Sequence, residues 1–399
     1  MSMLSRTALA LGTLLAAHTA GAANAPFQDF FFNVCANASG ALAQRCAETP
    51  NGLGDLSGDS ESSLNPSQAL GHGRVQIDGI RARTDGLPGE TAVIEAADFT
   101  LRISAHGSRM ERDRGDTLAE ERGLDGDGRD FDIGLDYRLS ERTVIGALLG
   151  LSRHDYDFVA EAPGNNFTPQ RRAGSADIDS TQFSLFASFT LGDDGYLFLS
   201  GGYGWTEGEY QRTSVFQEST RSLTQRNTDL RGDADGSLRW LSLDMGRDFV
   251  RDELGFGYYG GLTWARSSID GYSEQDLSGS GLAMRLEGIG RSSLQGVLGA
   301  TLSRTISGRA GVFVPQLRAQ WQHEFDDDAE AIEASYLLDP AATRFRLQGE
   351  RPDRGSGEIG LSLTGILGGG WSVYADYARL FSRDDLRRDR LSLGLLREF

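Results

Sequence analysis

The last ten residues of the chain constrain its fold more tightly than any other stretch. Side chains of an extended strand alternate between two faces. One face of this stretch carries Leu391, Leu393, Leu395 and Phe399, and the other carries Ser392, Gly394 and Glu398. Leu396 and Arg397 interrupt the alternation. The pattern predicts a strand with one apolar face and one small or polar face, ending on an aromatic residue.

The same two-residue period runs through the chain from about residue 92 onward. A representative stretch places Phe131, Ile133, Leu135, Tyr137 and Leu139 on one face, and Asp132, Gly134, Asp136 and Arg138 on the other. A succession of such strands predicts an all-β fold. Because the apolar signal is spread over alternate residues, a mean hydropathy of −0.35 is compatible with strands that cross a membrane.

The connections between these strands alternate in length. Short connections lie at 140–142, 192–195, 251–253, 307–309 and 368–370. Longer connections lie at about 113–129, 159–180, 213–235, 271–293, 326–355 and 382–387. Short turns at one end and long loops at the other are typical of outer-membrane barrels. The pattern predicts a closed, antiparallel transmembrane β-barrel of 12 strands, provided that residues 282–289 extend the eighth strand outward.

A soluble sandwich of two sheets is the alternative, because its strands also have one polar face. Aromatic residues near the strand ends would form interface girdles in a barrel and core contacts in a sandwich. These residues are Trp205, Trp264, Trp321, Trp371, Tyr203 and Tyr377. Pro315 lies inside a predicted strand and suggests a bulge there, because proline lacks the N–H group that a ladder uses.

The amino-terminal end and the charge indicate where the chain acts. Residues 1–23 are predicted to be a removable signal peptide, with Arg6 before a short apolar run and small residues near its end. Outside this stretch, no apolar run is long enough for a membrane helix. The net charge of −18, without a basic block, disfavours nucleic-acid binding. We therefore expect export from the cytoplasm. The terminal Phe399 resembles the signal of Gram-negative outer-membrane barrels, and this resemblance implies the outer membrane as the destination.

Residues 24–65 differ in composition from the strands and are predicted to form a short passenger with a helix over 36–47. The only two cysteines, Cys35 and Cys46, lie close together in this segment. In an oxidising compartment such a pair predicts a disulfide, and two free thiols are the alternative.

Residues 66–91 are predicted to be a linker and candidate pore helix, since Asn65 and Pro66 resemble a helix start. The barrel domain then covers 92–399. Its interior would admit about one helix or one or two extended segments. Arginines of the linker would meet carboxylates of the wall, with solvated arginines as the alternative. The candidate lumen-facing residues are Arg74, Arg81, Arg83, Asp132, Asp136 and Asp244.

Two motifs give the barrel a resemblance to the translocator domain of the classical autotransporters of type V secretion. Residues 314–325 are similar to the Pro-x-Leu-x-x-x-Trp-x-His-Glu-Phe strand of that family. The matching residues are Pro315, Trp321, His323, Glu324 and Phe325. The final Leu-Gly-Leu-Leu-Arg-Glu-Phe is the second match, shared by many barrels. The resemblance covers about residues 92–399.

The resemblance implies a barrel that inserts with the help of barrel-assembly machinery and periplasmic chaperones, with Phe399 as the assembly signal. The passenger would cross to the cell surface and leave a helix in the pore. Some autotransporters cut themselves within the pore at Asn, which makes Asn65 a candidate point. Outer-membrane lipid is the other expected partner, and a monomer is the expected state. The passenger of this chain is much shorter than those usual in the family.

No residue set predicts catalysis, a cofactor or a metal site. No pair among the five histidines has metal-ligand spacing, and His323 is interpreted as a strand-end residue near the interface. His154 and Asp155 could join a loop serine in a hydrolase set, but no nucleophile motif accompanies them. The sequence favours a translocator of autotransporter type. The alternatives are a passive pore or structural barrel and, with less support, a barrel enzyme.

Overall fold

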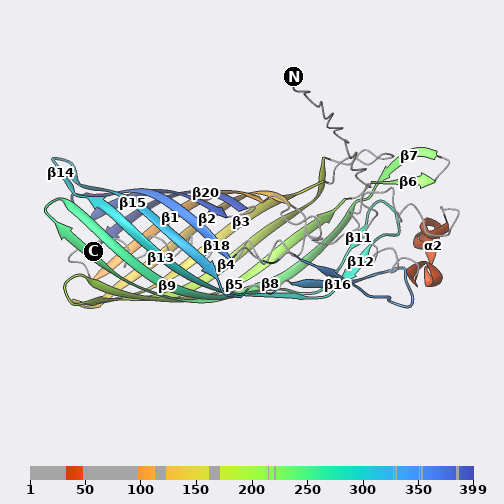
Figure 1. Ribbon diagram of the computed structural model, residues 1–399, viewed down its shortest axis with the longest axis horizontal. Coiled ribbons are helices and arrows are strands. Elements are labelled where there is room, and N and C mark those ends of the chain that lie inside the picture. Colours follow the sequence, from red (N-terminus) through yellow and green to blue (C-terminus); the bar gives the residue numbers. More distant parts are fainter. Residues whose placement is uncertain are drawn as a thin grey trace, which may run out of the picture.

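Twelve long strands roll into one closed antiparallel barrel (Figure 1), so the predicted fold and strand count are confirmed. The computed structural model describes residues 33–47, 98–112, 123–160, 171–213, 215–219, 222–326, 328, 330–349, 351, 354–382 and 386–399. The predicted signal peptide, Asn65 and the candidate pore helix over 66–91 lie outside these residues, as does the predicted start of the barrel at residue 92.

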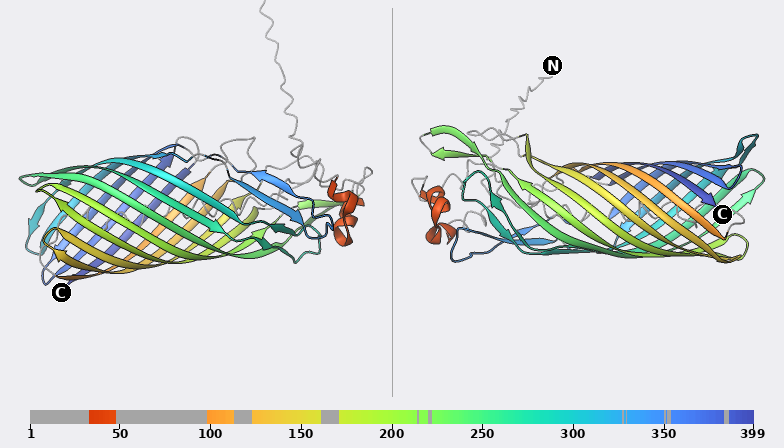
Figure 2. Two further views of the ribbon diagram at one scale, coloured as in Figure 1. Left: turned by 90° about the horizontal axis from the view of Figure 1, so that it is seen from below. Right: turned by 180° about the vertical axis from the view of Figure 1, so that it is seen from behind.

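The barrel closes because its first and last strands pair with each other. The wall consists of β1 (Phe99–Arg112), β2 (Leu124–Ser140), β3 (Thr143–Val159), β4 (Arg172–Leu191), β5 (Gly195–Arg212), β8 (Leu230–Arg251), β9 (Leu254–Ile269), β13 (Ile289–Arg304), β15 (Gly311–Glu324), β18 (Gly355–Leu367), β19 (Trp371–Ser382) and β20 (Leu386–Glu398). Each strand pairs with its neighbours in the chain, and β1 pairs with β20 from Thr100 opposite Glu398 to Arg112 opposite Leu386. Two further views show the same continuous wall (Figure 2).

The two faces of the wall differ in polarity as the alternation predicts. On β2, the apolar residues at alternate positions from 131 to 139 are 39–61% exposed and point outward. Asp132 and Asp136, between them, are 7% and 4% exposed and point inward. Hydrocarbon offers no hydrogen-bond partners. The wall is compatible with the bilayer because its outward side chains are apolar and its backbone groups are paired all the way round the barrel.

The wall strands extend further toward the long-loop end of the barrel than predicted. β2 begins at Leu124, β4 at Arg172 and β8 at Leu230, so much of the connections expected at 113–129, 159–180 and 213–235 is strand. Beyond the bilayer both faces of a strand can meet water, and the outward positions carry charged residues such as Asp125 and Asp127 instead of apolar ones. The apolar alternation that predicts each strand therefore stops at the edge of the hydrocarbon.

Two local predictions need correction. Residues 282–289 do not continue the eighth strand, because β12 (Met284–Leu286) pairs with β10 (Tyr272–Ser273) and β16 (Ala331–Tyr336) outside the barrel wall. Pro315 causes no bulge: β15 keeps one register with β18, pairing Pro315 with Leu363. The missing N–H leaves instead a short break in pairing on the other side of β15, between β13 and β14 (Ile306–Gly308).

Smaller elements gather at the end of the barrel opposite the C-terminus (Figures 1 and 2). β10, β12, β16 and β17 (Phe345–Gln348) form a four-stranded sheet, β11 (Gln275–Asp276) pairs with the start of β8, and β6 (Val215–Ser219) pairs with β7 (Ser222–Asn227). The helix α2 (Gly40–Ala47) follows a helical turn at 33–37, so the helix predicted over 36–47 is interrupted near Ser39. Among the described residues, no helix is long and apolar enough to cross a membrane.

Aromatic side chains inside the barrel lie over glycines of neighbouring strands. A Cβ atom added to Gly146 would lie 2.2 Å from Cζ of Phe186 on β4, a buried residue, and one added to Gly299 would lie 2.2 Å from Cζ of Tyr259 on β9. A ring fills the space where the glycine has no side chain, which pins the register of the two strands.

We expect Gly146→Ala to lower the free energy of unfolding by about 1–3 kcal/mol, because the new methyl group must displace the Phe186 ring. Urea-induced unfolding of the detergent-solubilised barrel measures this change. Gly107→Ala is the matched control, since a Cβ atom at Gly107 meets no atom within 4 Å. Equal destabilisation by the two substitutions would contradict the packing role of Gly146.

Candidate functional site: the barrel interior and its outer cap

The predicted wall carboxylates all line the interior. Arg102 on β1 donates a hydrogen bond from Nη2 to Oδ2 of Asp136 at 3.1 Å, and both side chains are nearly completely buried. Nε2 of His106 lies 3.1 Å from Oδ2 of Asp132. Asp244 accepts a hydrogen bond from the Ser242 hydroxyl at 2.9 Å. Their predicted partners Arg74, Arg81 and Arg83 lie outside the described residues.

A second polar network, which was not predicted, crosses β15, β18, β19 and β20. Nη2 of Arg318 lies 3.4 Å from Glu358 and 3.7 Å from Asp376. Arg388 approaches Glu358 at 3.9 Å, and Arg390 approaches Asp376 at 3.6 Å. A buried charge is tolerated only when it is paired and hydrogen-bonded. The inward parity of each residue was readable from the sequence, but its partner depends on strand register.

Further hydrogen bonds join polar side chains of the interior wall. The Tyr259 hydroxyl donates to Oε1 of Gln320 at 2.6 Å, and Nε2 of Gln320 donates to Oε1 of Glu358 at 3.0 Å. Hydrogen-bond donors and acceptors of the wall thus both face the interior.

The histidines do not assemble the hydrolase set considered from the sequence. Nε2 of His154 lies inside the barrel, 3.2 Å from Oδ1 of Asp130. Asp155, the next residue, points outward and accepts a hydrogen bond from Arg153 at 3.3 Å. The two residues therefore lie on opposite faces of β3. Among the described residues, no group of three His, Cys, Asp or Glu side chains could hold a metal ion.

The residues of the family-motif strand divide between the two faces of β15. Outside, the His323 ring stacks 5.4 Å from Trp321 and meets Phe325 edge-on at 4.8 Å. Inside, Glu324 accepts hydrogen bonds from the Ser293 hydroxyl at 2.6 Å and the Leu294 N–H at 2.9 Å. Glu324 thus ties β15 to β13, and His323 belongs to the aromatic outer surface.

The predicted girdle residues face outward and are exposed. Their exposed fractions lie between 41% and 57%, for Trp205, Trp264, Trp321, Trp371, Tyr203 and Tyr377. At the end of β20, Arg397 lies over the rings of Trp371 and Phe399, at 4.9 and 5.5 Å. The fifth tryptophan, Trp240, is buried inside the barrel.

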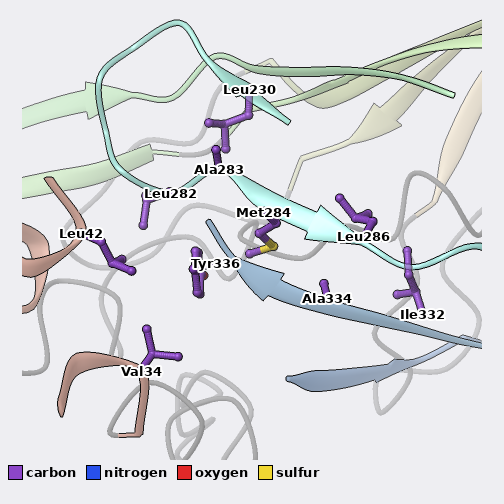
Figure 3. Packing of buried hydrophobic residues seen from close by; sticks show 10 residues of the cluster. All are labelled: Val34, Leu42, Leu230, Leu282, Ala283, Met284, Leu286, Ile332, Ala334 and Tyr336. Carbon is purple, nitrogen blue, oxygen red and sulfur yellow. The ribbon is translucent and has the colours of Figure 1, made fainter. Parts of the chain in front are cut away.

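A folded cap stands at the long-loop end of the barrel, and it includes the segment 33–47. A disulfide joins Cys35 to Cys46. Val34 and Leu42, both fully buried, pack with residues of β12 and β16 (Figure 3). The other members of this hydrophobic cluster are Leu230, Leu282, Ala283, Met284, Leu286, Ile332, Ala334 and Tyr336. We call the segment and the four-stranded sheet beneath it the outer cap.

The approach of the segment to the sheet is close. Ser39 donates hydrogen bonds from its N–H and its hydroxyl to the Leu338 carbonyl, at 2.9 and 2.8 Å. Gly281 has φ of +80°, and a Cβ atom there would lie 2.5 Å from the Leu42 nitrogen. The backbone of the segment therefore rests directly on a glycine of the loop before β12.

A buried ion pair fixes the outer cap to the barrel wall. Arg212, at the end of β5, donates from Nε and Nη2 to the two carboxylate oxygens of Glu274 at 2.8 and 2.5 Å. It also donates to the Leu282 carbonyl at 3.0 Å, and Glu274 accepts from the Met284 N–H at 2.9 Å. Burial lowers the pKa of Arg212, but the Glu274 carboxylate raises it to above its ordinary value.

We expect Glu274→Gln to loosen the outer cap, because it leaves the Arg212 charge buried without its carboxylate, a loss of about 3–5 kcal/mol. Amide hydrogen exchange at Leu337 and Glu287, whose N–H groups bond within the cap, should accelerate by about 100-fold or more. Glu253→Gln is the control, since its ion pair with Arg304 is exposed and should contribute under about 1 kcal/mol. Unchanged amide hydrogen exchange in Glu274→Gln would contradict the inference that the Arg212–Glu274 pair fixes the outer cap to the wall.

The loop that leads into β12 is organised by one carboxylate. Asp276 accepts hydrogen bonds from the N–H of Ser278 at 3.0 Å, the N–H of Gly281 at 2.6 Å and the Ser280 hydroxyl at 3.0 Å. Burial by itself would raise the pKa of Asp276. These hydrogen bonds lower the pKa by more than burial raises it, so the pKa lies below its ordinary value.

A lowered folded-state pKa means that Asp276 stabilises the loop when ionised. Its contribution is present above the ordinary pKa, near 3.8, and is lost as the pH falls through the lower folded value. We expect amide exchange at Gly281, corrected for intrinsic rates, to rise below about pH 4 in the wild type. Asp276→Asn should exchange faster at neutral pH and show no such step. A step of the same size in both proteins would assign it to another group.

Comparisons with known proteins agree with this architecture. The family model described as autotransporter beta-domain matches residues 105–378. The translocator domain of autotransporter NalP from Neisseria meningitidis matches with a TM-score of 0.62 and 18% identity, over 84% of this chain and 99% of that chain. The beta domain of the Bordetella autotransporter BrkA gives 0.50 and 18%, over 76% and 100%. The transport unit of AIDA-I from Escherichia coli gives 0.50 and 13%, over 84% and 99%. No curated protein matches the sequence.

Proposed function

Because this chain belongs to the autotransporter beta-domain family, we propose that its barrel carries the chain's own short amino-terminal segment, residues 24–65, to the cell surface. The family is one of the Gram-negative outer membrane, which is the membrane that the barrel spans. In this role the barrel transports the amino-terminal segment and displays it at the cell surface. This role requires no catalytic residue.

The observation that carries the proposal is the position of two points in the chain. Residue 47 ends α2 in the outer cap. Asp98 lies at the other end of the barrel, where its carbonyl accepts a hydrogen bond from the Arg138 N–H at 2.9 Å, next to a short turn. The residue after it, Phe99, accepts one from the N–H of Phe399 at 3.1 Å. Residue 47 and residue 98 therefore lie at opposite ends of the barrel (Figure 1).

The physics of the bilayer favours the route through the interior. A path along the outside would expose unpaired peptide groups to hydrocarbon, at several kcal/mol for each group. A 17-residue strand such as β2 extends about 55 Å, or about 40 Å along the axis at the usual tilt. The roughly 50 residues from 48 to 97 span about 75 Å as a helix and more when extended, so the length suffices.

The expected partners follow from the same proposal. Phe399 is 70% exposed at the end of β20, where barrel-assembly machinery and periplasmic chaperones could contact it before closure. Outer-membrane lipid would surround the apolar wall of a monomer. A passive pore is the competing function, and it predicts no display of residues 24–65.

An epitope tag between Pro26 and Phe27 tests the proposal. We expect antibody to label this tag on intact cells, because residues 33–47 lie in the outer cap. The same tag between Asp193 and Asp194, in a short turn, should be labelled only after the outer membrane is opened. Labelling of the first tag only after permeabilisation would exclude surface display, and single-channel conductance of the full chain would then test the passive pore.

A further inference from the structure

Two arginines stand side by side on the outward face of the barrel wall. Arg239 on β8 and Arg266 on β9 are directly opposite each other in the ladder, and both are exposed. Their chain neighbours Leu238 and Ala265 are buried inside the barrel. Both guanidinium groups therefore project from the surface that faces the membrane and not into the interior.

The surroundings of the pair mark the border between hydrocarbon and headgroups. One step toward the short turns, the outward residues are Leu241 and Trp264, 54% and 41% exposed. One step toward the outer cap they are Ser237 and Ser268, whose hydroxyl oxygens lie 2.9 Å apart. On β5, Tyr203 stands opposite Arg239 and Trp205 opposite Ser237, with their rings 5.0 Å apart. Tryptophan and tyrosine prefer this depth of a membrane.

The pair lacks a carboxylate partner within the described part of the chain. Several other outward arginines of the wall are ion-paired, as Arg153 is with Asp155 at 3.3 Å and Arg172 with Asp157 at 2.6 Å. Neither Arg239 nor Arg266 has an ion pair among the described residues. Like charges directly opposite on neighbouring strands destabilise a sheet. An anion bound between the two arginines would remove this repulsion.

The Arg266 guanidinium lies toward β13, over a residue without a side chain. Gly290 on β13 stands opposite Ser268, and a Cβ atom there would lie 3.5 Å from Nη2 of Arg266. Ser292 on β13 stands opposite Arg266. The patch thus offers two guanidinium groups and the hydroxyls of Ser237, Ser268 and Ser292, with no bulky side chain at Gly290.

We propose that Arg239 and Arg266 bind the phosphate group of an outer-leaflet lipid. The planar fork of a guanidinium matches two phosphate oxygens, and the serine hydroxyls supply further donors. Leu241 and Trp264 lie below the arginines, where acyl chains attached to that phosphate would run. A free phosphate ion has no apolar group that could contact Leu241 and Trp264. The inference concerns only the outer wall and does not depend on translocation.

Native mass spectrometry of the full-length protein in neutral detergent, titrated with phosphatidic acid, tests the site. This lipid carries a phosphate monoester. We expect the double variant R239Q/R266Q to weaken lipid binding by roughly 30-fold, about fivefold for each arginine. R239K/R266K keeps the charges without the forks and should lose less. R153Q is the matched control, because its arginine is outward but already paired, and it should bind as the wild type does.

Two outcomes would overturn the proposal. Phosphatidic acid binding that is equal in the wild type and R239Q/R266Q would show that the arginines do not hold the lipid. Inorganic phosphate that competes at the concentration of the lipid itself would identify a free-anion site instead. All three variants replace exposed side chains, and a heat-dependent shift in electrophoretic mobility checks that each barrel has closed.

Discussion

The structure depends on one constraint: inside hydrocarbon, each backbone N–H and C=O group must find its partner within the protein. The pairing of β1 with β20 completes that condition, because it leaves no open sheet edge in the membrane. Once the sheet is closed, side chains have only two destinations. Outward positions take leucine and aromatic residues, whereas inward positions form a confined polar space in which charges must pair, as Arg102 and Asp136 do.

The barrel stabilises its interior and its outer cap by different means. Between the membrane interfaces the interior holds hydrogen-bonded polar groups and rings that lie over glycines, such as Tyr259 over Gly299. The outer cap, in water, has a compact apolar cluster in which Leu42 meets residues of β12 and β16. The Arg212–Glu274 pair joins the two regions, and it is buried at the point where the wall strands meet the cap. A segment distant in sequence thereby becomes part of the same folded unit.

The sequence was sufficient for the fold but not for the contacts. The alternating lengths of the connections predicted the strand number. The alternation of apolar and polar residues predicted the inward direction of Asp132 and Asp136, because the face of a strand residue is a local property. The pairing of Asp132 with His106 depends on the register of β1 against β2, which alternation does not encode. The outer parts of the strands were missed where charge replaced apolar residues. Leu282, Met284 and Leu286 alternate like a wall strand, so only their long-range partners on β16 reveal a separate sheet.

Gly281 carries an evolutionary consequence. Its left-handed backbone and its contact with the Ala41–Leu42 peptide leave no room for any side chain while the disulfide-closed segment is docked. Position 281 and the segment some 240 positions earlier are thus expected to change together across related proteins. A lineage that discards the segment removes the steric part of that restriction, so a larger residue at the equivalent position would record the loss.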